Sequence, residues 1–232
     1  MKLSEIIDFL DERIPKSLAL KGDEIGFKKD YDLSQDIESV KIYMDLFPED
    51  DINSENTLII THHPPLFLPK TPTYTIHSNW DILDGGANDA LAKALNLEVI
   101  DYFDENTNIG RVCKADLKFF KLKSTVLKNF NRSRIVNNMD DERTIRNVGI
   151  ISGFGLKNPD YIKLAKAKNL DVLISGDLTH ETAILAKNLK ITLIDLTHHE
   201  SEVSGLYALE NIIKELDINT EVIDKNPIEV IK

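Results

Sequence analysis

The chain has 232 residues, of which 42% are hydrophobic and 29% charged, and its formal net charge is -11. This length and apolar content are sufficient for one large domain or two compact lobes. The negative charge argues against a protein that coats duplex nucleic acid, because such binding depends on neutralising phosphates. The apolar runs are far shorter than the roughly 20 residues that span a bilayer, and the first residues lack a secretory hydrophobic segment, so we expect a soluble cytoplasmic protein.

The first part of the sequence predicts a helix, two strands and a second helix. Residues 4–13 carry apolar side chains at helical spacing, begin at a capping serine and end before Pro15. Residues 40–46 and 57–61 are predicted to be strands, and the second of these runs into a His-His-Pro-Pro turn whose prolines end ladder pairing. The helix at 85–95 opens with two glycines.

The last part of the sequence alternates regularly between apolar runs and amphipathic stretches. The predicted strands are 148–152, 172–175, 191–196 and 220–223, and the predicted helices between them are 159–168, 182–188 and 203–216. Such alternation is typical of parallel βαβ units with helices on both faces of a sheet. We therefore predict an α/β fold with mixed, largely parallel sheets flanked by helices.

The middle of the chain has weak periodicity and is rich in basic residues. Eight of them lie between positions 111 and 134, with phenylalanines between them and a single acidic residue, Asp116. This run is interpreted as a solvated face, with a site for a phosphate-bearing small molecule or for single-stranded nucleic acid as alternatives. We predict a first lobe at 1–113, a basic connecting segment at 114–147 and a second lobe at 148–232, which act as one functional unit.

All six histidines occur in four short clusters. These clusters are Thr61-His62-His63-Pro64, His77-Ser78-Asn79-Trp80-Asp81, Asp177-Leu178-Thr179-His180 and Thr197-His198-His199-Glu200-Ser201-Glu202. At least two of them follow a strongly apolar, β-branched run and therefore fall at strand ends, where parallel sheets bind ligands. The single cysteine, Cys113, excludes a thiolate-rich zinc site. The distribution predicts a metal site with nitrogen and oxygen ligands at one rim of the fold.

The spacing within the clusters indicates which side chains can share an ion. His198 and Glu202 are four residues apart near a predicted helix start, so both face the same way. Adjacent His62 and His63 project differently from an extended chain and can reach two ions, or one ion and a substrate. Asp81 is the nearest further carboxylate. This donor set suits Zn, Mn, Fe, Co or Ni better than Mg or Ca, and a pair of such ions favours hydrolysis or hydration.

Hydrolysis also needs a group that moves protons, and three residues are candidates. His77 is predicted to be catalytic, to face the substrate or to support a metal ligand. Asp177 is predicted to line the site or to accept a hydrogen bond from its own backbone in a turn. His180 is predicted to act in catalysis or to belong to the cap of the following helix. The neighbouring His199 and Glu200 are expected to be solvated. The sequence contains no Walker-type loop and no guanine-specific signature.

In their order along the chain, these motifs resemble the GTP cyclohydrolase 1 type 2 family, also called the NIF-three-like family. The resembling segments are His62-His63-Pro64-Pro65-Leu66-Phe67, His77 to Asp81, Gly86-Ala87-Asn88-Asp89-Ala90-Leu91, Ser175-Gly176-Asp177 and Thr197-His198-His199-Glu200-Ser201-Glu202. The chain departs from the family pattern at Ser78, where the family has threonine, and at Thr197, where it has glycine. Its middle segment is too short for the domain inserted in longer relatives.

The resemblance implies a site and an assembly that spacing alone does not. It implies two divalent metal ions held by His62, His63, Asp81, His198 and Glu202, two similar α/β lobes with the metal site between them at the strand carboxyl ends, and a toroidal homohexamer. It also implies hydrolytic opening of the imidazole ring of GTP, or of a related nucleotide, with release of formate. No membrane partner is expected, and nucleic acid is not favoured as a partner.

Two other functions fit the same residues. A dinuclear phosphoesterase would release phosphate instead of formate. A non-catalytic, oligomeric protein that binds metal or a partner would have a closed ligand shell without an exchangeable water.

Overall fold

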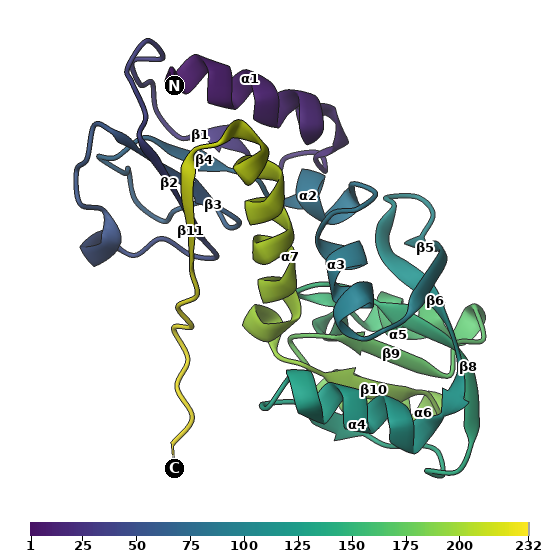
Figure 1. Ribbon diagram of the computed structural model, residues 1–232. Helices are drawn as coiled ribbons and strands as arrows, with labels where there is room; N and C mark the ends of the chain where they lie inside the picture. The colour runs from purple at the N-terminus through teal and green to yellow at the C-terminus, as the bar shows by residue number, and fades with distance from the viewer. Residues whose placement is uncertain (232) are drawn as a thin grey trace. The chain divides into compact units, whose positions relative to one another are not determined.

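The computed structural model describes residues 1–231 and divides into two compact units (Figure 1). Unit 1 consists of Met1–Gly86 with Leu206–Lys232, and unit 2 of Ala87–Gly205. Both are α/β, each with one sheet and flanking helices, as predicted. The division differs from the predicted boundaries at 113 and 147, because residues 87–147 belong to unit 2 and the last strand belongs to unit 1.

Unit 1 is built on a five-stranded sheet with the order β1-β4-β3-β2-β11. Its strands are β1 (Gly26–Phe27), β2 (Ser39–Tyr43), β3 (Thr57–Thr61), β4 (Thr73–Thr75) and β11 (Asn219–Ile223). The pairs β11–β2, β2–β3 and β3–β4 are parallel, and β1 pairs antiparallel with β4. In Figure 1 the yellow strand β11 therefore lies beside the blue strand β2, although 175 residues separate the two chain segments.

The buried positions explain why these segments adopt their structures. All five residues of β3 are buried, which is typical of a parallel strand covered on both faces. Helix α1 (Leu3–Arg13) buries Leu3, Ile6 and Leu10, at helical spacing, and leaves its charged residues outside. The short helix α2 (Ser78–Ile82) follows β4 and is buried along its whole length.

Unit 2 contains a six-stranded sheet with the order β5-β6-β8-β9-β10-β7. The strands are β5 (Glu98–Asp104), β6 (Ile109–Lys118), β7 (Arg134–Val136), β8 (Thr144–Ile150), β9 (Val172–Ser175) and β10 (Thr192–Asp195). Strands β8, β9 and β10 are parallel, while β5, β6 and β7 add antiparallel pairs. The sheet is thus mixed, with its parallel part in the region where βαβ units were predicted.

The helices of unit 2 are α3 (Ala87–Ala94), α4 (Phe119–Asn129), α5 (Pro159–Ala167) and α6 (His180–Leu189). One core cluster joins Leu91 of α3 and Leu122 of α4 to alternate residues of the sheet, among them Ile174 and Ile194. Helix α7 (His198–Ile213) begins in unit 2 and ends in unit 1. Short 3₁₀ turns lie at Lys16–Leu18, Pro48–Asp50, Gly155–Lys157 and Lys214–Leu216.

The predicted basic connecting segment is an integral part of unit 2. It supplies the end of β6, helix α4 and strand β7, and α4 buries Phe119, Leu122 and Val126 while its lysines face outward. Arg111 is an exception to the predicted solvated face. Its side chain is 1% exposed and pairs with Asp89 at 2.7 Å.

Within residues 1–231, no helix combines the length and apolar character that crossing a bilayer requires.

Candidate metal-binding residues

Strand β3 carries His62 and His63 directly beyond its carboxyl end. The backbone N–H of His62 donates to the carbonyl of Tyr43 at 2.9 Å, and that of His63 to the carbonyl of Met44 at 2.9 Å. The parallel pairing of β3 with β2 therefore continues past the last ladder residue of each strand. Because the sheet fixes both backbone groups, the positions from which the two imidazoles project are fixed as well. The prolines turn the chain only after them.

Three imidazole rings come together in unit 1. The ring centroids of His62 and His63 are 4.9 Å apart, those of His62 and His77 5.2 Å, and those of His63 and His77 5.4 Å. One ring nitrogen from each of the three residues lies within 4.8 Å of the others. Nitrogen atoms at this spacing can converge on one divalent ion or on two neighbouring ions.

In each of these rings, Nδ1 already has an acceptor. Nδ1 of His62 lies 3.1 Å from the carbonyl of Ile76, that of His63 lies 2.8 Å from Asp45, and that of His77 lies 2.7 Å from Asp23. Carbonyls and carboxylates accept hydrogen bonds, so Nδ1 carries the proton in each neutral ring and Nε2 carries the lone pair. Metal-binding histidines in proteins are commonly held in this way.

Asp81 adds a carboxylate to the same group. It lies on α2, is 5% exposed, and places Oδ1 3.7 Å from Nε2 of His62. Its backbone N–H donates to the carbonyl of His77, so α2 and the histidine before it form one tight turn. The structure therefore places His77 and Asp81, two of the candidate residues, in the same local group as the His-His pair.

Asp23, which no sequence motif indicates, binds His77 and the first residue of α2. Its carboxylate accepts from His77 Nδ1, from the Ser78 backbone N–H at 3.0 Å and from the Ser78 hydroxyl. Burial raises the pKa of Asp23, but the hydrogen bonds from Ser78 and His77 outweigh burial and lower it overall. Serine at position 78 thus keeps the hydroxyl that threonine supplies in the family pattern.

Unit 2 brings a second group together at the carboxyl ends of β9 and β10. His198 is the first residue of α7, and its Nε2 lies 3.3 Å from Glu202 one turn later. Its Nδ1 lies 3.0 Å from Asp177, which follows β9. The predicted helical pair of His198 and Glu202 is present, and Asp177 contacts His198 through the nitrogen that faces away from Glu202.

This arrangement perturbs the protonation of both partners of the Asp177–His198 hydrogen bond. Burial alone would lower the pKa of His198, but hydrogen bonds to Asp177 and Glu202 raise it to about 10. The hydrogen bond from His198 lowers the pKa of Asp177 against the effect of burial, and the ion pair with Lys157 lowers it further. The geometry of the group is therefore that of a histidine held between two carboxylates.

Gly153, in the loop after β8, allows this group to form. It has φ +75°, and a Cβ added there would lie 2.2 Å from Oε1 of Glu202 and 3.2 Å from Nε2 of His198. Its N–H donates to the hydroxyl of Ser201 at 2.8 Å. A side chain at this position would occupy the space of the Glu202 carboxylate, so the backbone itself forms a wall of the group.

Thr197 holds an unusual backbone conformation immediately before His198. Its φ is +71°, a region that favours glycine and disfavours β-branched side chains. Its N–H donates to Asp195 at 3.0 Å, and its hydroxyl accepts from the N–H of Glu200 at 3.4 Å. Arg134 binds the opposite side of the Asp195 carboxylate. These contacts explain how threonine occupies a position where the resembling family has glycine.

The remaining residues of the histidine clusters lie elsewhere. His180 is exposed at the first residue of α6, after the capping residue Thr179, and its ring forms no hydrogen bond within residues 1–231. His199 was expected to be solvated, but only 8% of it is exposed, because the first turn of α7 faces inward there. Glu200 was expected to be solvated too, yet it is half-buried and contacts Arg132.

The ligand atoms of both groups fit a borderline divalent ion. They are imidazole nitrogens and carboxylate oxygens, without sulfur, which suits Zn, Mn, Fe, Co or Ni. Hard ions such as Mg and Ca prefer shells composed of oxygen alone. Both groups therefore consist of candidate nitrogen and oxygen ligands without a thiolate.

Comparison with known proteins decides the family. The model of the Duf34/NIF3 (NGG1p interacting factor 3) family matches residues 1–73 and 70–227, and so covers nearly the whole chain. The chain belongs to the Duf34/NIF3 family. The resemblance inferred from the histidine motifs is confirmed. The match also includes every residue of the two groups described above.

Two archaeal relatives of this Duf34/NIF3 protein are similar along nearly their full length. A "GTP cyclohydrolase 1 type 2 homolog" from Methanothermobacter thermautotrophicus is 38% identical over 225 residues, 97% of this chain and 93% of that protein. A protein of the same name from Methanocaldococcus jannaschii is 31% identical, over 96% of this chain and 98% of the relative.

Solved structures agree with the fold of the family. The structure described as reduced HcgD from Methanocaldococcus jannaschii has a TM-score of 0.84 and 30% identity, and the match covers 97% of this chain and 98% of that chain. A Bacillus cereus protein related to NIF3 has the same TM-score at 17% identity, covering 100% and 99% of the two chains, and supports the fold alone.

Proposed function

We propose that this Duf34/NIF3 protein is a hydrolase that depends on two divalent metal ions and acts on GTP or a related nucleotide. The proposed ligands are His62, His63 and Asp81 of unit 1 and His198 and Glu202 of unit 2, and the ions are Zn, Fe, Mn, Co or Ni. The observation that carries the proposal is the set of three imidazoles in unit 1 whose Nδ1 atoms all have acceptors. The names of the archaeal relatives support GTP as the first substrate to test.

The bound ions would supply activation of water and stabilisation of developing negative charge. Opening of the imidazole ring of a purine also requires proton transfer to the departing nitrogen. We propose His77 for this step. Asp23 accepts the Nδ1 proton, so Nε2 of His77 can take up a proton and return it, and Asp23 stabilises the charged ring meanwhile.

Asp177 and His180, the other predicted catalytic residues, are not assigned the proton transfer in this proposal. Asp177 is a positioning residue, because its carboxylate binds Nδ1 of His198 and thereby directs Nε2 toward Glu202. His180 remains an untested prediction; its exposure at the start of α6 equally suits a residue of the helix cap.

The activity is tested by incubating the metal-loaded protein with GTP and measuring formate and phosphate. We expect the unmodified protein to release more moles of formate than there are moles of protein. We expect His63→Ala and Glu202→Ala to release no formate. Phosphate without formate would replace the proposal with a metal-dependent phosphoesterase. Metal binding with neither product would favour a non-catalytic role in binding a metal or a partner.

The role of His77 is tested with His77→Asn. The asparagine amide keeps a donor for Asp23 but removes Nε2, so we expect bound metal to remain while formate release falls about 10²–10⁴-fold. The measurements are metal analysis and formate release on the same sample. Loss of metal together with activity would instead make His77 a ligand, since its Nε2 would then be needed for binding.

Assembly follows from the same family resemblance. We propose a homohexamer, and light scattering on the purified protein should give six times the chain mass. A monomer would contradict this part of the proposal without affecting the metal ligands of each unit.

A further inference from the structure

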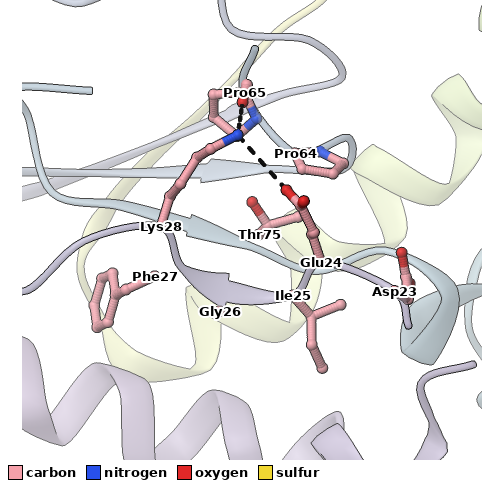
Figure 2. A pocket seen from close by; sticks show the side chains of 9 residues that line it. All are labelled: Asp23, Glu24, Ile25, Gly26, Phe27, Lys28, Pro64, Pro65 and Thr75. Carbon is pink, nitrogen blue, oxygen red and sulfur yellow. Dashed lines mark hydrogen bonds and ion pairs between the residues drawn. The ribbon is translucent and has the colours of Figure 1, made fainter. Parts of the chain in front are cut away.

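A cavity of about 320 Å³ lies in unit 1 next to the histidine group (Figure 2). Its lining includes Asp23, which binds His77, and Pro64, which follows His63. Glu24, Lys28 and Pro65 also line it. This volume is at the lower end of ligand pockets and suits one ring system better than a whole nucleotide.

The cavity presents a cation and a carboxylate side by side. Figure 2 shows Lys28 and Glu24 pointing toward one another, with Lys28 Nζ 3.6 Å from Glu24 Oε2. Lys28 Nζ also donates to the carbonyl of Pro65 at 2.6 Å, which ties strand β1 to the His-His-Pro-Pro turn. An ammonium group has three donors, so Lys28 can bind a ligand acceptor while keeping both contacts.

The two proline residues form an apolar surface beside this charged pair. Pro64 and Pro65 belong to the turn that begins with His63, and Figure 2 shows them on the same side of β1 as Glu24 and Lys28, whereas the side chains of Ile25 and Phe27 point to the other side. Apolar surface combined with a few converging polar groups is typical of sites that bind small molecules. The side chain of Glu24 is 71% exposed, so its carboxylate is accessible to a ligand.

We propose that this cavity binds the guanine base of the substrate. The Glu24 carboxylate accepts from guanine N1–H and the N2 amino group, and the Lys28 ammonium donates to O6. An acceptor beside a donor is the complement of this edge of guanine, whereas adenine lacks both the N1–H and the O6 acceptor. The inference rests on the proposed function for its substrate, but the recognition pattern depends only on the cavity.

The position of the cavity agrees with the chemistry. In a purine, C8 belongs to the imidazole ring, at the opposite end from the N1, N2 and O6 edge. A guanine held by Glu24 and Lys28 through that edge leaves its imidazole ring unobstructed. Asp23 and Pro64, on the same cavity, adjoin His77 and His63, where the reaction requires that ring.

The test is equilibrium binding of GMP, IMP and AMP to the full chain, measured by calorimetry. IMP differs from GMP only in lacking the N2 amino group. We expect GMP to bind about tenfold more tightly than IMP, since one hydrogen bond to a charged group is lost, and AMP to bind more weakly still. Equal or tighter binding of AMP, or no binding of GMP, would overturn the inference.

Two variants and one control make the assignment specific. Glu24→Gln should weaken GMP binding about tenfold and remove the preference for GMP over IMP, while Lys28→Met should weaken both about equally. Glu12→Gln, a matched change at an exposed position of α1, should bind as the unmodified protein does. If Glu24→Gln keeps the preference for GMP, the inference is wrong.

The two proposals fail separately. Guanine-selective binding that depends on Glu24, without formate release from GTP, would retain the cavity assignment and remove the cyclohydrolase activity. Formate release with unchanged nucleotide selectivity in Glu24→Gln would retain the activity and remove the cavity assignment.

Discussion

At the scale of single residues, the histidine group of unit 1 depends on the acceptors of the three Nδ1 protons. They are a backbone carbonyl, Asp45 and Asp23. With these in place, each ring can present Nε2 without rearrangement. Removing such a partner typically weakens metal binding by 10–100-fold although the ligand itself remains.

These residues also show which candidates a sequence can suggest and which it cannot. The histidines, Asp81 and Glu202 could be selected because their side-chain chemistry and local spacing are visible in one segment. Asp23 lies 54 residues before His77, and no spacing rule connects them. Asp45 could have been found, because it is the second residue after β2 as His63 is the second residue after β3, and neighbouring parallel strands end at the same edge.

Thr197 provides a prediction about backbone strain. We expect Thr197→Gly to stabilise the protein by about 0.5–1 kcal/mol, because relief of the strain at φ +71° exceeds the few tenths lost with the hydroxyl cap. The free energy of unfolding in urea measures this. The control is Thr179→Gly, which removes a capping hydroxyl at φ -99° and should destabilise the protein. Destabilisation by both substitutions would refute the assignment of strain.

At the scale of elements, strand β7 holds the loop that leads into α7. Arg134 on β7 is paired in register with Asp195 on β10, and Asp195, which is fully buried, accepts the N–H of Thr197 just before His198. One arginine of the predicted basic run thus has a structural role. The sequence could not reveal it, because antiparallel register between distant strands depends on the whole sheet.

Arg134→Ala tests this connection. It leaves the buried Asp195 carboxylate without its charged hydrogen-bond donor, so we expect a loss of about 1–3 kcal/mol in the free energy of unfolding. Lys163→Ala removes an exposed pair with Asp160 on α5 and should cost less than about 1 kcal/mol. Similar small effects of both substitutions would show that the β7–β10 pair contributes little.

The close approach of the β8 loop to the first turn of α7 is tested by Gly153→Ala. The added Cβ would lie 2.2 Å from Oε1 of Glu202, so the carboxylate must move and metal binding by unit 2 should fall at least tenfold. Gly22→Ala is the matched control: φ is +87° and no atom lies within 4 Å of its Cβ position. Metal analysis should separate the two variants, although both share the backbone penalty of about 1–2 kcal/mol. Equal metal binding would disprove the steric argument.

At the scale of the whole molecule, the α/β class was predictable but the division of the chain was not. The alternating pattern at 148–223 correctly gave β8, β9 and β10 with their helices, because parallel strands are continuous apolar runs. It assigned the last strand to the second lobe, although β11 pairs with β2 in unit 1. The hairpin of β5 and β6 was missed because its strands are partly exposed and lack a clear period.

The main proposal is that this Duf34/NIF3 protein binds two divalent ions, with His62, His63, Asp81, His198 and Glu202 as ligands. The most direct measurement is elemental analysis of protein purified without chelator, together with His63→Ala and Glu202→Ala. We predict about two ions per chain in the unmodified protein and clearly fewer in each variant. Absence of bound metal from the unmodified protein, even after incubation with Zn, Mn, Fe, Co or Ni, would contradict the claim.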